Sequence, residues 1–424
     1  MLDNTLIFVI LMSTKLTPKG MRDISPEDMY VRQEVISKIR SIFINYGFRP
    51  LETPVMEYLS TLRAKAGEEA DKQIFVIDGN EYGLRFDLTV PLSRYACATD
   101  APKPFKRYAI DKVWRREEPQ RGRFREFYQA DADIIGSEST RSEAELLSLA
   151  KDVCTAFGFN KPKIMINNRK ILDGIATSLD FVDQKPEVFR ILDKLDKIGE
   201  DEVEKLLTAL LGNKASKLLE IVRSKGDNKS RLSLAAKYSK EGAAELEEIV
   251  SMCDFEVEVD LFLVRGLGYY TGPVYEIKLA DGMGTVVAGG RYDNLLGVYG
   301  QGAAAVGISV GVERLITLIS ERRSTSSIKR TDTKVFVASV KPEYYEYSVL
   351  VATEFRKNGI AAETDLNIRN LRKQFDYANS LGISYVAIVG EKEKSSKSVT
   401  LRNMVEGSES SISISDAIKK LKQV

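Results

Sequence analysis

Apolar and polar residues follow two different periods along the chain, and the changes of period mark where helices and strands are expected. The first clear helix begins at Ser25-Pro26-Glu27-Asp28, which supplies a cap, a proline in the first turn and two acids that favour the helix dipole. Apolar residues then recur at helical spacing until Gly47, which ends the helix. Residues 48–55 are extended, and their two prolines confine this strand to an edge or an interface.

The central part of the chain predicts a sheet. Residues 75–77 and 82–86 form a predicted hairpin about Gly79-Asn80, and two longer strands are predicted at 108–115 and 123–135. A helix is predicted at 142–157. Further predicted strands cover 255–264, 274–278 and 285–288, and residues 303–319 begin as a strand and end as a helix.

Two stretches differ in composition from the rest. Residues 186–251 are rich in Leu, Lys and Glu with helical period, which predicts an inserted helical module of about these bounds. Residues 320–333 are polar and serine-rich, which is typical of a linker. The segments after it, 334–340, 345–358, 360–364, 371–381 and 385–389, alternate strand and helix. A chain of 424 residues exceeds one ordinary core, so we expect domains at 12–325 and 334–424 joined by 326–333.

The predicted strand 123–135 sorts its side chains by face. The segment VWRREEPQRGRFREFYQADAD (residues 113–133) contains no lysine, and one strand face carries Arg123, Arg125, Phe127, Gln129, Asp131 and Asp133. The other face is mostly apolar and suits a core. Arginine grips planar phosphate or carboxylate groups from two points, so the polar face is interpreted as a ligand surface. An exposed, salt-bridged hairpin is the alternative, and composition alone would favour it slightly.

Composition limits the chemistry. The chain contains no histidine, which excludes Ser-His-Asp and Cys-His nucleophile systems and every histidine metal site. The net charge is +1, so a nucleic-acid partner would have to be held by local basic patches. Three cysteines lie far apart without a CxxC pair, which fits a reducing compartment and indicates neither a zinc site nor a disulfide framework.

The N-terminus carries a short apolar run at residues 6–12. It is too short to span a bilayer, which takes about 20 residues, and it follows an aspartate where a signal peptide has a basic start. We interpret residues 1–11 as a start-codon extension before Met12, with an extra strand or a disordered tail as the alternatives. Without a targeting signal or membrane segment, a cytoplasmic protein is expected.

Five motifs and one further segment, from Lys19 onward, resemble a known family. KGMRDISPED with FINYGFRPLETPVME, FKRYAIDKVWRREEPQRGRFREFYQADADIIG and AVGISVGVERLITL resemble motifs 1, 2 and 3 of class II aminoacyl-tRNA synthetases. LVRGLGYYTGPVYEI and AGGRYDNLLGVYG resemble the signature segments of histidyl-tRNA synthetases, and LRFDLTVPLSRY resembles their archaeal and eukaryotic branch. The resemblance implies an α+β catalytic domain with a mixed, mostly antiparallel sheet, a helical insertion and a C-terminal α/β anticodon-binding domain.

The family's reaction has two steps, and neither strictly needs a protein nucleophile. The carboxylate of histidine attacks the α-phosphate of ATP to give histidyl-adenylate and pyrophosphate, and the ribose hydroxyl at the tRNA end then takes the acyl group. Positioning and charge neutralisation can supply most of the rate, which explains how a chain without histidine could catalyse it. The resemblance makes Arg115 and Arg265 the catalytic residues at the α-phosphate. A cation–π contact of Arg265 with a tyrosine is its structural alternative.

The same resemblance assigns the binding residues. ATP would be bound by Arg115, Glu117, Arg123, Phe127 and Arg314, with Phe127 and Arg314 on either side of adenine. The amino-acid pocket would contain Asp87, Thr89 and Gln129 around the α-amino group, Asp133 and Tyr270 at the imidazole nitrogens, and Arg265, Tyr269 and Tyr292. A core position is about equally expected for Tyr292 taken alone, and Asp131 has no family role beyond possible support of the pocket. Mg²⁺ would bind through the ATP phosphates, with Glu117 as a candidate ligand, although sequence does not fix its ligands.

Partners follow from the resemblance as well. The tip of the charged hairpin, with Arg116 and Arg121, would meet the acceptor end of histidine-specific tRNA. Arg369, Arg372 and Lys373 are candidate backbone contacts near the anticodon, although a solvated helix face is the simpler interpretation for any one of them. The motif 1 helix and strand would form a homodimer interface. A non-catalytic, histidine-sensing regulatory paralogue is the alternative function, but such paralogues usually lack the C-terminal domain and the signature arginine.

One position departs from the family pattern. The signature usually reads Arg-Gly-Leu-Asp-Tyr-Tyr, and this chain has Gly268 in place of the aspartate. The arginine and both tyrosines are kept, so we expect activity to be kept. Any support of Arg265 by that aspartate is absent here.

Overall fold

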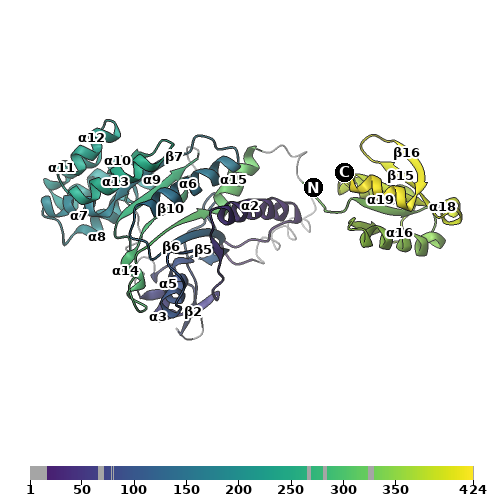
Figure 1. The fold of residues 1–424 in the computed structure, drawn as a ribbon, viewed down its shortest axis with the longest axis horizontal. Helices are drawn as coiled ribbons and strands as arrows, with labels where there is room; N and C mark the ends of the chain where they lie inside the picture. Colours follow the sequence, from purple (N-terminus) through teal and green to yellow (C-terminus); the bar gives the residue numbers. More distant parts are fainter. Residues whose placement is uncertain are drawn as a thin grey trace, which may run out of the picture. The chain divides into compact units, whose positions relative to one another are not determined.

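The chain folds into two compact units in the computed structural model, which describes residues 17–64, 71–77, 79, 81–264, 269–279, 284–322 and 329–423 (Figure 1). One unit consists of Met1–Asp23 and Gln33–Arg322, and the other of Ile24–Arg32 and Arg323–Val424. The expected N-terminal extension, residues 1–11, lies outside the described residues, as do residues 326–328 of the expected linker. The domain boundaries at 325 and 334 therefore stay predictions.

An eight-stranded sheet forms the centre of the first unit. Its order is β1-β5-β6-β11-β10-β9-β7-β8, and the described strands pair antiparallel except for β1 with β5 and β7 with β8. The strands are β1 (Arg49–Pro50), β5 (Phe105–Trp114), β6 (Glu126–Ile135), β7 (Lys163–Asn168), β8 (Glu258–Val259), β9 (Pro273–Lys278), β10 (Thr285–Arg291) and β11 (Ala305–Gly311). This mixed, mostly antiparallel sheet confirms the predicted fold class.

A second, small sheet has the order β2-β4-β3. Its strands are β2 (Met56–Tyr58), β3 (Val76–Ile77) and β4 (Tyr82–Leu84). The antiparallel pairing of β3 with β4 confirms the predicted hairpin. The loop from β4 into helix α5 (Thr89–Ala98) contributes to the candidate site described below.

The long hairpin of β5 and β6 differs from its prediction at one end. The second strand begins at Glu126 and not at residue 123, so the prediction that Arg123 and Arg125 belong to it was wrong. Pro119 and Gly122 lie in the connection, Gly122 has φ of +67°, and Gln120 pairs with Arg123 in an isolated bridge. Arg125 is tied elsewhere, because its backbone N–H donates to Gly20 and its Nε donates to the carbonyl of Glu117.

Helices complete the first unit. They are α3 (Leu59–Arg63), α6 (Arg141–Ala156), α14 (Asp293–Leu296), α15 (Val312–Arg322) and, from Gln33 onward, α2 (Pro26–Asn45). Helix α2 begins at the predicted proline, and Gly47, at φ of +76°, lets the chain leave it for β1. Apolar residues at helical spacing on α2, Val35, Ile39 and Phe43, are fully buried. None of the described helices is long and apolar enough to cross a membrane.

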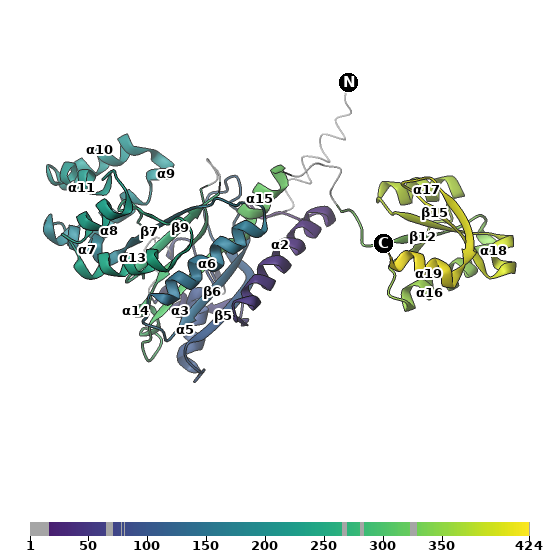
Figure 2. The same cartoon turned by 45° about the horizontal axis from the view of Figure 1, so that its top comes forward.

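The helical module is longer than predicted. It comprises α7 (Arg169–Ser178), α8 (Lys185–Leu192), α9 (Leu195–Ile198), α10 (Glu200–Leu211), α11 (Lys214–Val222), α12 (Asn228–Ala235) and α13 (Lys240–Met252). These helices gather at the end of the sheet formed by β7 and β8 (Figures 1 and 2). Strand β7 and helix α7 were not predicted, and the predicted strand 255–264 was wrong in length, because only Glu258–Val259 pairs there.

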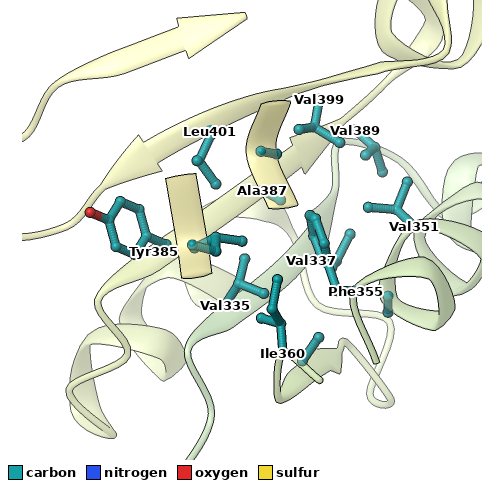
Figure 3. Packing of buried hydrophobic residues seen from close by; sticks show 14 residues of the cluster. Val335, Val337, Val351, Phe355, Ile360, Tyr385, Ala387, Val389, Val399 and Leu401 are labelled. Carbon is teal, nitrogen blue, oxygen red and sulfur yellow. The ribbon is translucent and has the colours of Figure 1, made fainter. Parts of the chain in front are cut away.

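The second unit is an α/β domain with a five-stranded sheet of order β13-β12-β14-β15-β16. Its elements are β12 (Val335–Ser339), a 3-10 turn η2 (Pro342–Tyr344), α16 (Tyr345–Lys357), β13 (Ala362–Thr364), α17 (Leu371–Ser380), β14 (Tyr385–Val389), α18 (Glu391–Ser396), β15 (Ser398–Asn403), β16 (Glu409–Ser413) and α19 (Ile414–Lys422). Figure 3 shows Val335 and Val337 of β12, and Ala387 and Val389 of β14, packed with Phe355 of α16. The elements after residue 390 were not predicted.

Candidate active site

A polar face of β6 is enclosed at the centre of the first unit. Gln129, Asp131 and Asp133 share this face, and each is less than 10% exposed. The register places Arg107 of β5 opposite Asp133, and Ser309 of β11 opposite Asp131. The surface that was predicted to offer these groups to a ligand is therefore buried, and charge is costly there unless it is paired.

Asp133 is held by two buried partners. Its Oδ2 lies 3.0 Å from Nη2 of Arg107, and its Oδ1 accepts a hydrogen bond from the hydroxyl of Tyr292 at 2.5 Å. Arg107 also donates to the carbonyl of Leu88. Burial raises the pKa of Asp133, and the charge of Arg107 opposes that rise. Gly307 makes room for this arrangement, since a Cβ there would lie 1.9 Å from Oδ1 of Asp133.

Arg291, the residue before Tyr292, anchors this part of the chain to α6. Arg291 forms a bidentate ion pair with Glu143 of α6, at 2.7 Å and 2.8 Å, and both side chains are buried. Tyr292 itself is buried, as the core interpretation expected, yet its hydroxyl points at a site carboxylate. Tyr269 contacts Tyr292 edge to face with ring centroids 6.0 Å apart, and Tyr270 lies 4.9 Å from Tyr269. The predicted pocket tyrosines thus form one cluster.

Arg115 immediately follows β5 and is anchored from two sides. Its Nε donates to the carbonyl of Phe86 at 2.8 Å, and its Nη2 donates to Oε1 of Gln129 at 3.2 Å. Its guanidinium lies 5.2 Å from the ring centroid of Phe127. Gln129 in turn donates to the hydroxyl of Ser309. These two contacts fix the direction of the guanidinium, and three of its five N–H groups remain to bind a ligand.

Asp87 lies just before α5 and faces the same groups. Its Oδ1 accepts from the backbone N–H of Val90 at 3.0 Å, while Oδ2 is buried without a hydrogen-bond partner among the described residues. Burial raises the pKa of Asp87 to about 6, although Arg115 and Arg107 act against the rise. Thr89 begins α5 and is half-buried. The loop between β4 and α5 therefore places a buried carboxylate, whose charge is unfavourable away from water, where it interacts with the charge of Arg115.

The raised pKa of Asp87 predicts a pH effect on stability. The folded carboxyl titrates at about 6 and the unfolded one at 3.8, so the ligand-free fold loses stability as pH rises from about 4 to about 6. The shift corresponds to about 3 kcal/mol. The side chain of Asp87→Asn can still accept the hydrogen bond from Val90 but does not titrate. Between pH 4 and pH 6 its unfolding free energy should therefore rise by up to about 3 kcal/mol relative to that of wild type. Chemical unfolding at several pH values measures it, and parallel curves for the two proteins would contradict the assignment.

The other residues predicted to bind ATP lie in or near the hairpin connection and on α15. Glu117 Oε2 lies 3.0 Å from Nε of Arg123, and both are partly buried. Arg314 donates to the carbonyl of Thr285. Phe127 has Arg115 over its ring, and the predicted pairing of Phe127 with Arg314 around adenine stays a prediction.

The predicted tRNA contacts fall in both units. Arg116 and Arg121 are exposed at the hairpin connection, and Arg121 pairs with Glu321. In the second unit, Arg372 and Lys373 are exposed on the first turn of α17. Arg369 differs from them, because it is half-buried over the ring of Tyr377 at 4.4 Å and pairs with Asp365. Arg369 thus has a structural role within its unit.

Sequence reasoning missed residues that support the site. Arg107, Ser309 and Glu143 hold Asp133, Gln129 and Arg291. Arg107 and Asp111 lie on the same face of β5, and this alternation of polar residues is the one sequence signal that could have identified Arg107. Ser309 and Glu143 come from distant segments and leave no local signal. Arg265 and Gly268 lie outside the described residues.

The chain is similar to known proteins over nearly its whole length. A family model described as Histidyl-tRNA synthetase matches residues 20–315, and one described as Anticodon binding domain matches residues 334–424. A histidine–tRNA ligase of Porphyromonas gingivalis is 38% identical, over 92% of this chain and 95% of the relative. Another from Korarchaeum cryptofilum is 39% identical, over 91% and 93%. The crystal structure of histidyl-tRNA synthetase from Nostoc sp. PCC 7120 is similar with a TM-score of 0.79 at 29% identity, covering 96% of this chain and 98% of that one.

Proposed function

The chain belongs to the histidyl-tRNA synthetase family, and we propose that it activates histidine on the buried polar face of β6. Its activity is that of a histidine–tRNA ligase, which joins histidine to its tRNA through histidyl-adenylate. One observation carries the placement of the site. Two arginines and three buried aspartates converge there, and the carboxylates have raised pKa values because burial removes them from water.

Arg115 is proposed to neutralise charge at the reacting centre. Its anchors at Phe86 and Gln129 hold the guanidinium before substrate binds, so little reorganisation is needed when negative charge develops on the α-phosphate. Arg265 is proposed to approach the same phosphate, by its place in the signature segment. Together they would bring the carboxylate of histidine and the α-phosphate into contact.

The imidazole is proposed to bind between Asp133 and Tyr270. Asp133 Oδ1 already accepts from Tyr292 but can accept a second hydrogen bond, so an imidazole N–H can share this oxygen. Arg107 orients the carboxylate, and its charge acts against the rise in the pKa of Asp133 that burial causes. An amino acid with a different side chain would leave these buried polar groups without hydrogen-bond partners, so the site would reject it strongly. This would give selectivity for histidine.

ATP is proposed to bind where the hairpin connection meets α15, with Arg123, Phe127 and Arg314 as contacts. Class II synthetases use ATP with a divalent metal, and Mg²⁺ typically binds through one or two carboxylates and substrate phosphates. Glu117 fits this role as a partly buried carboxylate that pairs with Arg123, the arginine proposed to contact the phosphates. When bound, Mg²⁺ would offset charge on the triphosphate.

A homodimer is proposed through α2 and β1. Strand β1 is an edge of the sheet, and exposed apolar side chains lie close by in sequence, namely Ile44, Val55 and Met56. The tRNA is proposed to contact the hairpin connection and the anticodon-binding domain. A cytoplasmic location is supported by the free state of all three cysteines.

ATP–pyrophosphate exchange across the standard amino acids tests the proposed site. We expect exchange with histidine alone, because only histidine satisfies both Asp133 and Tyr270. A regulatory paralogue would bind histidine without exchange, and calorimetry with histidine separates that outcome. Exchange with a different amino acid would contradict the pocket assignment.

A further inference from the structure

A fully buried asparagine at the end of β7 holds a turn that lies far away in the sequence. The Nδ2 of Asn167 donates to the carbonyl of Leu263 at 3.0 Å and to the carbonyl of Leu261 at 3.3 Å. Its Oδ1 accepts from the backbone N–H of Asn168 at 2.8 Å, which fixes the orientation of the amide. Both donor groups of this side chain are therefore used on one short piece of the chain.

This piece leads into the signature segment LVRGLGYYTGPVYEI, residues 263–277, and the same end of β7 also holds the segment after its tyrosines. The backbone N–H of Arg169, two residues beyond Asn167, donates to the carbonyl of Gly272 at 2.9 Å. From Pro273 onward the segment becomes β9, which pairs with β7. The signature segment is therefore tied to β7 on both sides of Tyr270.

Tyr270 packs on the residue that Asn167 holds. Leu263 forms a buried apolar cluster with Met165 of β7 and Val274 of β9, and the partly buried Tyr270 packs against this cluster. The ring of Tyr270 also lies over Gly290 of β10, where a Cβ would come within 2.8 Å of it. Close-packed side chains transmit displacements to their neighbours, so a shift of Leu263 is expected to move the ring of Tyr270.

The side chain that this turn requires is an uncharged amide. The two carbonyl groups need two donors and the N–H of Asn168 needs an acceptor, and an asparagine side chain supplies both. An apolar side chain of the same shape would leave the three backbone groups without this partner, which is unfavourable in a buried position. The turn would then be free to shift.

We propose that Asn167 is a positioning residue for histidine recognition, because it holds the turn at residues 261–263 and thereby places Tyr270 for the proposed contact with imidazole. The inference rests on the proposed function, since it concerns the same pocket. Asn167 acts through Leu263 and Tyr270 and does not itself touch the substrate. It therefore sets the KM for histidine and not the KM for ATP, whose proposed contacts lie on other elements.

A double-mutant cycle tests this role. Asn167→Leu keeps the shape of the side chain but removes both donors, and Tyr270→Phe removes the hydroxyl. In histidine-dependent exchange, each should raise the KM for histidine by about 3- to 10-fold, the range expected for loss of one neutral hydrogen bond, with the KM for ATP within about twofold of wild type. The double variant should be no worse than the weaker single variant, because both lose the same contact. Multiplying effects would overturn the proposal.

Asn168→Leu is the matched control, because Asn168 is equally buried but its Nδ2 donates to Gly242 and Glu245 of α13. This variant should lose stability, while its KM for histidine stays within about twofold of wild type. An equal rise of that KM in both asparagine variants, or an equal rise of both KM values in Asn167→Leu, would assign Asn167 a structural role and overturn the proposal. So would an unchanged KM for histidine in Asn167→Leu.

Leu263→Ala replaces Asn167→Leu in the cycle if the latter does not fold. It truncates the side chain that packs on Tyr270 and keeps the carbonyl that Asn167 holds. The same selective rise of the KM for histidine is expected, and its absence would overturn the proposal. An unchanged KM in Tyr270→Phe would remove the imidazole contact and this inference together. Absence of exchange with histidine in wild type would instead refute the proposed function.

Discussion

Replacing Arg115 with alanine is expected to lower histidine-dependent ATP–pyrophosphate exchange by about 10³-fold or more, the range seen when a phosphate-stabilising arginine is lost. The guanidinium is held by Phe86 and Gln129 before substrate arrives, so its contribution is made in the transition state with little reorganisation. The fold should be kept, because Arg115 is only partly buried and its anchors are a carbonyl and an amide.

Arg115→Lys refines the test. Lysine keeps the positive charge but lacks the planar guanidinium that can bond to both anchors and to phosphate. The exchange rate of this variant should therefore lie between those of Arg115→Ala and wild type. Arg141→Ala is the matched control, because this arginine is exposed at the start of α6. Exchange in Arg115→Ala within tenfold of wild type would remove Arg115 from the reacting centre.

The largest expected loss of stability comes from Arg107→Met. The substitution leaves Asp133 as a buried charge without its cation and leaves the carbonyl of Leu88 without a donor. Breaking one partner of a buried ion pair costs about 3–5 kcal/mol. Chemical unfolding of the first unit, followed separately from that of the second, measures this loss.

The double variant Arg107→Met with Asp133→Asn isolates the cause. It removes the unpaired charge, so most of the lost stability should return, while histidine binding should stay weak because the pocket carboxylate is gone. A loss below about 1 kcal/mol in the single variant would show that Asp133 is neutral in the ligand-free fold, and the ion pair would then have no energetic role.

The elements with strong local signals were predictable. Helix α2 could be placed from its cap and proline, and the β5–β6 hairpin from alternation and turn residues. The strand face of Gln129, Asp131 and Asp133 was predictable from period alone. Its burial was not, because the side chains that contact this face, Arg107, Tyr292 and Ser309, come from segments far apart in the chain.

Other features depended on tertiary contacts. Arg123 and Arg125 continue the alternation of β6, but the N–H of Arg125 bonds to Gly20 and the chain leaves the sheet there. Strand β7 is short and pairs with β9, which follows it by about a hundred residues. The neighbouring sequence therefore gives no sign of the strand that stabilises β7. The hydrogen bond of Tyr292 to Asp133 depends on Arg291 being held by Glu143 of α6.

A crystal structure with the sulfamoyl analogue of histidyl-adenylate tests the central claim most directly, because the analogue carries the ammonium, imidazole and adenosine parts together. The predicted complex has the ammonium within hydrogen-bond distance of Asp87 and Gln129, the imidazole at Asp133, and the sulfamoyl group at Arg115. An analogue bound away from the polar face of β6, or with its ammonium directed away from both Asp87 and Gln129, would contradict it.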